Sequence, residues 1–174
     1  PRGALPARGA VLAGDGGWLV PGLWDHHVHT MQWALVSQRT PLGHATSAAH
    51  AASLMGDAVV LDGRRVGTGF RDAFWGDRPT LALLDAATGD TPTYLINADV
   101  HSVWLNTAAL RREGFEPDGI GILREEPAFE ISRRLNAVDA ATGDRLVRQM
   151  ATDAAARGVV GLVDLDMAWN EEAW

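Results

Sequence analysis

Apolar and polar residues follow one another along this chain in segments that predict alternating helices and strands. The clearest helix is predicted over 142–157, where apolar residues form one stripe at helical spacing and Gly158 ends the segment. The continuous apolar run 159–163 follows at once, as in a strand buried on both faces of a parallel sheet. A helix, a glycine and a buried strand in this order are typical of a β/α barrel or a doubly wound sheet.

The same pattern recurs, less regularly, over the rest of the chain. The predicted strands are 18–24, 58–61 and 91–97, and the predicted helices are 30–38, 47–55, 80–87 and 102–112. We expect Ser102 to cap the last of these helices and Gly114 to end it.

Of the two α/β architectures, the barrel is favoured. Barrel enzymes gather their chemistry at the carboxyl ends of strands. Several polar residues fall at or just after predicted strand ends: His27, His29, Asp99, His101, Asp164 and Asp166. A doubly wound nucleotide-binding sheet would need a G-x-G-x-x-G motif, whereas the run 67–72 lacks the third glycine.

Two histidines, His27 and His29, come directly after the predicted strand 18–24. Because side chains alternate between the two faces of a strand, this pair points to one side and His26 to the other. Two neutral imidazoles on one side can share a divalent metal such as zinc. The alternative is a solvent-exposed histidine cluster at a strand end, without a ligand role.

Composition narrows the class of protein. The chain has 174 residues, of which 47% are hydrophobic and 21% charged, as expected of a globular domain with a core. With a net charge of −7 and no basic stripe, nucleic acid and membrane surfaces are not expected partners. No cysteine is present, so any metal ligands must be nitrogen or oxygen atoms. No apolar run of about 18 residues and no signal peptide is visible, which favours a cytoplasmic enzyme.

Four segments together resemble one known family. The run 21–29, with the pattern P-G-[FLW]-x-D-x-H-x-H, is similar to the first barrel strand of the amidohydrolase superfamily. The segments 98–110, 121–125 and 156–164 resemble, in the same order, three blocks of its YtcJ-like branch, amidohydrolase family 3. These blocks are D-x-H-S-x-W-x-N-[ST]-x-A-L, G-[IV]-L-x-E and A-x-G-V-T-x-x-x-D. A related deaminase or phosphotriesterase-like enzyme would share the two histidines, but not the block at 98–110.

The resemblance implies a metal-dependent hydrolase that cleaves C–N bonds other than peptide bonds, in amides or N-substituted formamides, through a metal-activated water. His27 and His29 would bind one or two divalent ions, with zinc as the first choice. The implied fold is a metal-dependent hydrolase β/α (TIM) barrel with a small β-sandwich beside it. Residues 1–17 would be a remnant of the sandwich region, and 18–174 the first β/α units of the barrel.

The family's metal-bridging lysine, its two later histidines and its late aspartate have no counterpart in these 174 residues. The chain opens at Pro1 and closes at Trp174, which we interpret as a sequence cut at both ends. The alternative function is therefore a truncated, noncatalytic fragment that binds or assembles without turnover. An incomplete barrel has open sheet edges, so we expect a homo-oligomer.

The resemblance also supplies candidate residues for a small amide substrate. His101 would act in catalysis, by donating a hydrogen bond to the substrate carbonyl or its oxyanion. Asp99, Trp104 and Glu125 would contact the substrate. Each has a simpler alternative: Asp99 can hold His101 for structural reasons, Trp104 is more often a core residue, and Glu125 can be a solvated surface acid beside Glu126.

Two further acidic residues follow the last predicted strand. Asp164 and Asp166 are placed where they could approach a metal. Helix capping explains such residues more simply, because carboxylates accept hydrogen bonds from the free N–H groups at helix N-termini. We therefore expect capping.

Overall fold

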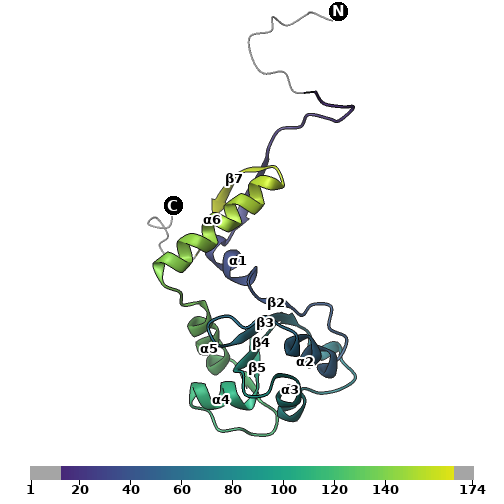
Figure 1. Cartoon of the computed structure of the whole chain (residues 1–174), viewed down its shortest axis with the longest axis vertical. Helices are drawn as coiled ribbons and strands as arrows, with labels where there is room; N and C mark the ends of the chain where they lie inside the picture. Colours follow the sequence, from purple (N-terminus) through teal and green to yellow (C-terminus); the bar gives the residue numbers. More distant parts are fainter. Residues whose placement is uncertain (1–12, 167–174) are drawn as a thin grey trace, which may run out of the picture.

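The computed structural model describes residues 13–166 and shows a chain in two parts. The first part is formed by both ends of the described chain: β1 (Leu23–Val28), α1 (Thr30–Val36), α6 (Ala140–Ala156) and β7 (Val159–Asp164). The second part is everything between α1 and α6, and it folds beside the first as a separate layered unit (Figure 1). We call these the terminal part and the inserted part.

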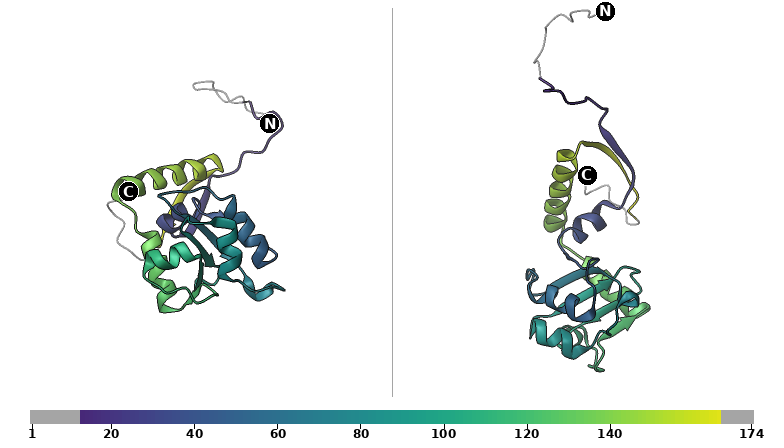
Figure 2. Two further views of the ribbon diagram at one scale, coloured as in Figure 1. Left: turned by 60° about the horizontal axis from the view of Figure 1, so that its bottom comes forward. Right: turned by 90° about the vertical axis from the view of Figure 1, so that its right-hand side faces the viewer.

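The terminal part is a β-α-α-β unit. β1 and β7 pair in parallel, with Trp24 opposite Gly161. Gly161 has no room for a side chain, because a Cβ there would lie 2.6 Å from the indole ring of Trp24. α1 and α6 lie on the same side of the two strands (Figure 2). Their contact is a small core made of Ala34, Leu35, Leu146, Val147 and Met150.

The inserted part is built on a five-stranded sheet of order β2-β3-β4-β5-β6. The strands are β2 (Thr40–Pro41), β3 (Arg65–Phe70), β4 (Thr93–Asn97), β5 (Ser102–Leu105) and β6 (Ile122–Arg124). β2, β3 and β4 are parallel, whereas β5 is antiparallel to both of its neighbours. The helices are α2 (Ala48–Gly56), the 3-10 turn η1 (Asp72–Phe74), α3 (Leu81–Thr88), α4 (Thr107–Glu113) and α5 (Glu126–Asn136).

Two hydrophobic cores cover the two faces of this sheet. Tyr94 and Ile96 of β4 pack with residues of α4 and α5, and Leu95 packs with residues of α2 and α3 on the other face. β4 is therefore buried along its whole length. At Gly67 in β3 a side chain would not fit, because a Cβ there would meet Leu42 at 2.6 Å and Met55 at 2.7 Å. The glycine lets α2 pack close to the sheet.

Most predicted elements are confirmed, with four corrections. The strand predicted at 58–61 is wrong: Val59, Val60 and Leu61 are exposed, and the strand lies later, at β3. Ser102 does not cap a helix but begins the buried strand β5. The first strand begins at Leu23 rather than 18, and Trp18 is 95% exposed. β7 is only partly buried, although its apolar run predicts burial on both faces.

The α/β class predicted from the sequence is confirmed. The sheet of the inserted part differs from the all-parallel pattern expected of barrel units over 18–174, because it contains two antiparallel strand pairs. The sandwich remnant expected at 1–17 falls mostly outside the described residues, and 13–17 contain no strand.

Three aspartates are held by backbone N–H groups at turns and helix starts. Asp77 accepts from the first residues of α2, Ala48 and Ala49, at 2.8 and 3.1 Å. Asp139 caps α6 by accepting the backbone N–H of Thr142. Asp118 accepts the backbone N–H of Gly121 in the loop before β6. These hydrogen bonds favour the ionised carboxylates and lower the pKa of all three below the ordinary value of 3.8.

We expect the fold to lose stability as the pH falls below 3.8. A carboxylate with a lowered pKa stabilises the folded state fully above its unfolded pKa, and this contribution is lost as the pH falls through the folded pKa. Thermal unfolding followed by circular dichroism between pH 7 and pH 2 measures the effect. Asp77→Asn should flatten the acid slope, whereas Asp90→Asn, at an exposed loop position, should keep it. Equal slopes for the two variants would contradict the assignment.

Candidate metal and substrate site

The histidine pair lies where β1 ends and α1 begins. His27 is the second-last residue of the strand, and His29 is the N-cap residue of the helix. Their ring centroids are 5.4 Å apart, edge to face. His26 instead stacks with Trp24, at 6.0 Å between centroids. The predicted alternation of these side chains is therefore confirmed: the pair shares one side of the strand and His26 lies on the other.

Two acidic residues, one at the end of β7 and one just after it, lie beside this pair because β7 is the parallel neighbour of β1. Asp166 accepts the N–H of Met31 at 2.8 Å, and Asp164 accepts that of Thr30 at 3.3 Å. The predicted capping role is confirmed, although the capped helix is α1, which follows the neighbouring strand. Asp166 also lies 3.8 Å from Nδ1 of His29, a distance for an ion pair but too long for a hydrogen bond.

The donor atoms at this strand end fit part of a metal site. Two imidazoles on one side are ligands that zinc and similar ions prefer, and both rings are accessible to solvent. Within residues 13–166, no three His, Asp or Glu side chains are placed to hold a metal ion together. The described chain thus offers two ligands and a nearby carboxylate, whereas catalytic zinc sites use three protein ligands.

The second candidate group lies in the inserted part, around the turn from β4 to β5. His101 Nδ1 is 3.1 Å from a carboxylate oxygen of Glu125, and the backbone N–H of Glu125 donates to the His101 carbonyl at 2.9 Å. Asp99 accepts the His101 N–H at 2.9 Å and so fixes the turn. Val100 has φ of 61° and Glu125 of 55°, a region that non-glycine residues seldom adopt.

This group is open to solvent and rests on one aromatic ring. The side chains of His101 and Glu125 are 57% and 71% exposed. The imidazole packs against Phe129, with 5.2 Å between centroids. Phe129, in the first turns of α5, is not among the site residues predicted from the sequence, because its contact with His101 depends on how α5 packs beside the turn. The two strained backbone positions and the exposed imidazole are typical of a functional site.

Trp104 is a core residue. It lies in β5 rather than on a helix, it is fully buried, and it packs among residues of α2 and α3. A substrate cannot reach it, so its expected role as a substrate contact is wrong and the core alternative is correct.

Asn106, from the same sequence block, is structural in this fold. Its Oδ1 caps α4 by accepting from Ala109 N–H at 2.8 Å, and it also accepts from Thr93 N–H at 3.0 Å. Its Nδ2 group lies near three acceptors: Thr88 Oγ1, Gly89 O and Thr91 O. The side chain is fully buried and ties α3, β4 and α4 together.

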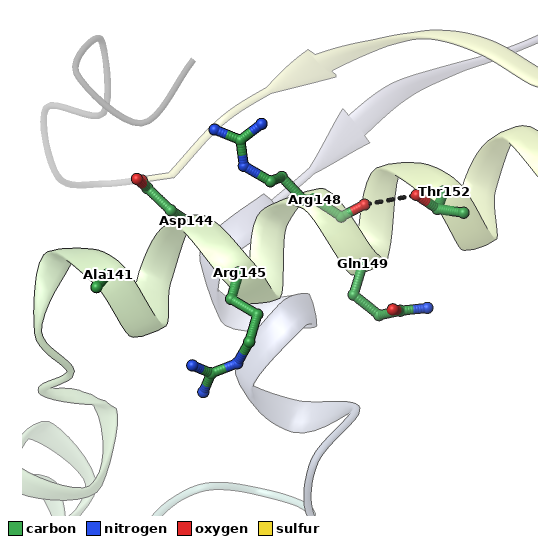
Figure 3. A pocket seen from close by; sticks show the side chains of 6 residues that line it. All are labelled: Ala141, Asp144, Arg145, Arg148, Gln149 and Thr152. Carbon is green, nitrogen blue, oxygen red and sulfur yellow. Dashed lines mark hydrogen bonds between the residues drawn. The ribbon is translucent and has the colours of Figure 1, made fainter.

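The structure does not join the two candidate groups. No hydrogen bond, ion pair or ring contact between described residues links the pair His27 and His29 to His101 and Glu125. A shallow hollow of about 430 Å³ runs along the exposed side of α6, and none of these four residues lines it. Its lining residues are Ala141, Asp144, Arg145, Arg148, Gln149 and Thr152 (Figure 3).

No helix among residues 13–166 has the length and the apolar character that crossing a bilayer would require.

Comparison with solved structures supports the fold. The chain is similar to an uncharacterized metal-dependent hydrolase from Pyrococcus horikoshii OT3, with a TM-score of 0.68 and 18% identity over 83% of this chain and 31% of that one. A second uncharacterized metal-dependent hydrolase, from Pyrococcus furiosus, gives a TM-score of 0.66 and 18% identity over 83% and 32% of the two chains.

Sequence comparison gives a relative and a family. The chain is 30% identical over 104 residues to Protein LONG AFTER FAR-RED 3 of Arabidopsis thaliana, a match that covers 58% of this chain and 18% of the relative. The chain thus spans less than a fifth of that relative and less than a third of the two solved structures. The model of the family described as "Amidohydrolase family" matches residues 11–174. Because this match covers nearly the whole sequence, the chain belongs to the amidohydrolase family.

Proposed function

We propose that this chain contributes to a metal-dependent hydrolase that cleaves C–N bonds other than peptide bonds, in small amides or N-substituted formamides. The observation that carries the proposal is the pair His27 and His29 on one side of the end of β1, beside Asp166, which follows β7. Family membership and the names of the two structural relatives support the class of reaction.

His27 and His29 would hold the metal as neutral nitrogen donors. When bound, a divalent ion, with zinc as the first choice, supplies Lewis-acid polarisation of the substrate carbonyl and lowers the pKa of water. Asp166 adds negative charge next to His29 and is itself held in place by the N–H of Met31. At 3.8 Å from Nδ1 of His29, this negative charge favours a cation at the strand end without a hydrogen bond to the ring.

His101 is our candidate for the group that binds the substrate carbonyl. Its imidazole is exposed, and its ring is positioned by Glu125 on one side and Phe129 on another. An imidazole N–H in this position can donate to the carbonyl oxygen and to the oxyanion that forms when water attacks. Asp99 would keep the turn in shape and, with Glu125, contact the polar atoms of the substrate.

His101→Ala is expected to lower kcat for an N-substituted formamide by about 100- to 1000-fold, as the loss of one oxyanion donor typically does. Bound zinc should stay unchanged, because His101 has no contact with His27 or His29 among the described residues. The measurement is steady-state hydrolysis by the zinc-loaded protein, with metal content determined in parallel. His44→Ala, at another exposed histidine of the inserted part, is the matched control. Similar rates for the two variants would rule out this role.

The alternative function is a chain that binds and assembles without turnover. It is favoured by the apolar side chains that β1 and β7 leave exposed, including Leu23, Trp24, Val160 and Val163. Exposed apolar side chains of this kind favour the homo-oligomer expected from the sequence.

One set of measurements separates the two functions. The chain is dialysed against zinc, and bound metal, light scattering and formamide hydrolysis are measured on the same sample. Stoichiometric zinc with hydrolysis supports the enzyme, and an oligomer with zinc but without hydrolysis supports the alternative. A chain that binds no zinc would contradict the metal site on which the proposed function depends.

A further inference from the structure

A cleft lies where the terminal and inserted parts meet, away from both candidate groups described above. The chain passes from the terminal part to the inserted part after α1 and returns after α5. A hydrogen bond from Arg39 Nη2 to Asn136 Oδ1 links these two connecting segments. Beside them is a cavity of about 160 Å³. Residues of both parts line it, among them Leu35 of α1, Val59 of the inserted part and Leu146 of α6.

Three arginines from three different segments line this cleft. Arg39 follows α1, Arg64 belongs to the tight turn before β3, and Arg145 belongs to α6. The turn is fixed by two backbone hydrogen bonds between Leu61 and Arg64, of 2.9 and 3.0 Å. In Figure 3, the side chain of Arg145 extends from α6 in the direction opposite to that of Arg148. We call this set the arginine cleft.

The positive charge in the arginine cleft is not balanced by the residues around it. Asp62 is the only acidic residue among the lining residues, against three guanidinium groups. Within residues 13–166, the arginines that form ion pairs are Arg133 and Arg134, and none of the three cleft arginines does so. Burial and the nearby charge of Arg64 lower the pKa of Arg39, as expected when like charges share a site.

Placing three guanidinium groups in a cleft lined by one carboxylate costs free energy, which an anion bound there would recover. Arginine offers five N–H donors in a planar fork that matches the oxygens of a phosphate. Three guanidinium groups and the Asp62 carboxylate leave two positive charges in the cleft. A ligand with two negative charges would neutralise them, whereas a single carboxylate would not. The remaining wall is largely apolar, with Leu35, Val59 and Leu146 among its residues, which suits an organic group attached to the phosphate.

We propose that the arginine cleft binds a phosphate group, as inorganic phosphate or as a phosphate monoester, through Arg39, Arg64 and Arg145. The site is separate from the proposed metal site. Because its residues come from both parts of the chain, the bound phosphate stabilises the contact between the terminal and inserted parts.

The test is calorimetric titration of the 174-residue chain with inorganic phosphate and with phenyl phosphate, at matched ionic strength against chloride. We expect saturable binding of phosphate and a higher melting temperature in its presence, since a ligand that binds only the folded state stabilises it. Tighter binding of phenyl phosphate would identify a monoester as the ligand, and equal binding would identify inorganic phosphate. Phosphate that binds no better than chloride would overturn the proposal.

Arg145→Gln tests the site without disturbing the core, because Arg145 is an exposed helix residue. Its loss should weaken phosphate binding by about 10- to 100-fold, the range for one hydrogen bond to a charged group. Arg148→Gln is the matched control, with the same change of charge on the same helix but outside the cleft. It should leave the affinity unchanged. Equal losses in the two variants would show that phosphate responds only to net charge, and would overturn the site.

Discussion

Replacing both His27 and His29 by alanine is expected to abolish stoichiometric zinc binding, with an affinity at least about 100-fold lower. Loss of a single outer-shell partner already costs about 10- to 100-fold in metal affinity, and here both direct ligands are removed. Hydrolysis of a formamide should disappear with the metal. Isothermal titration with zinc, and metal analysis after dialysis, measure the effect.

This experiment has an internal control on the same strand. His26→Ala removes an imidazole that stacks with Trp24 on the other side of β1, and should leave zinc binding unchanged. The double variant should still fold, because both histidines are accessible to solvent and surface substitutions usually change stability by no more than about 0.5 kcal/mol. Unaltered zinc binding in the double variant, or an equal loss in His26→Ala, would refute the metal site.

Asn106→Ala is expected to destabilise the fold by about 3–5 kcal/mol, a large share of the roughly 5–15 kcal/mol by which domains are stable. The substitution removes the cap of α4 and the partner of the Thr93 N–H. It also leaves buried acceptors of the segment 88–91 without their amide donor. Urea unfolding followed by circular dichroism gives the free energy of unfolding.

Asn136→Ala is the matched control for this prediction. The chemical change is the same, but Asn136 is half-buried and makes one side-chain hydrogen bond, to Arg39. Its loss should cost about 0.5–1.5 kcal/mol. If Asn106→Ala cost no more than Asn136→Ala, the buried network around Asn106 would not have the structural role that we assign to it.

Local signals in the sequence were sufficient for most helices. Ser47 and Thr80 cap α2 and α3 through their side chains, as residues of this type do at helix starts. Gly114 ends α4 with φ of 83°, a conformation that favours glycine. These features depend on a few neighbouring residues, so a single sequence is enough to predict them.

Strands that depend on distant contacts were harder to predict. β3 contains Gly67 and Gly69, which weaken its strand pattern, although Gly67 is required because α2 packs against it. Ser102 predicts a helix start at β5, whereas it begins the strand and the helix cap is Asn106. The continuous run of large apolar residues from 103 to 105 and the Asn-Thr pair after it are signals that indicate a short buried strand followed by a helix start.

For the candidate site, the sequence predicts which side chains of β1 point to the same side of the strand. It does not predict which distant segments of the chain contact one another. The positions of His27, His29 and His26 follow from alternation alone. The approach of Asp166 to His29 depends on the pairing of β1 with β7, which lie near opposite ends of the described chain. The arginine cleft was missed for the same reason, because its three arginines lie far apart in the sequence.

The insertion of one part of the chain into the other has a consequence for the order of folding. β1 and β7 can pair only after a loop that contains nearly all the described residues has closed, whereas the pairs among β2 to β6 close much shorter loops. Loop closure costs conformational entropy that grows with loop length, and distant pairings slow folding. We therefore expect the central residues to become protected from hydrogen exchange first during refolding, and the strand that carries the histidine pair to become protected last.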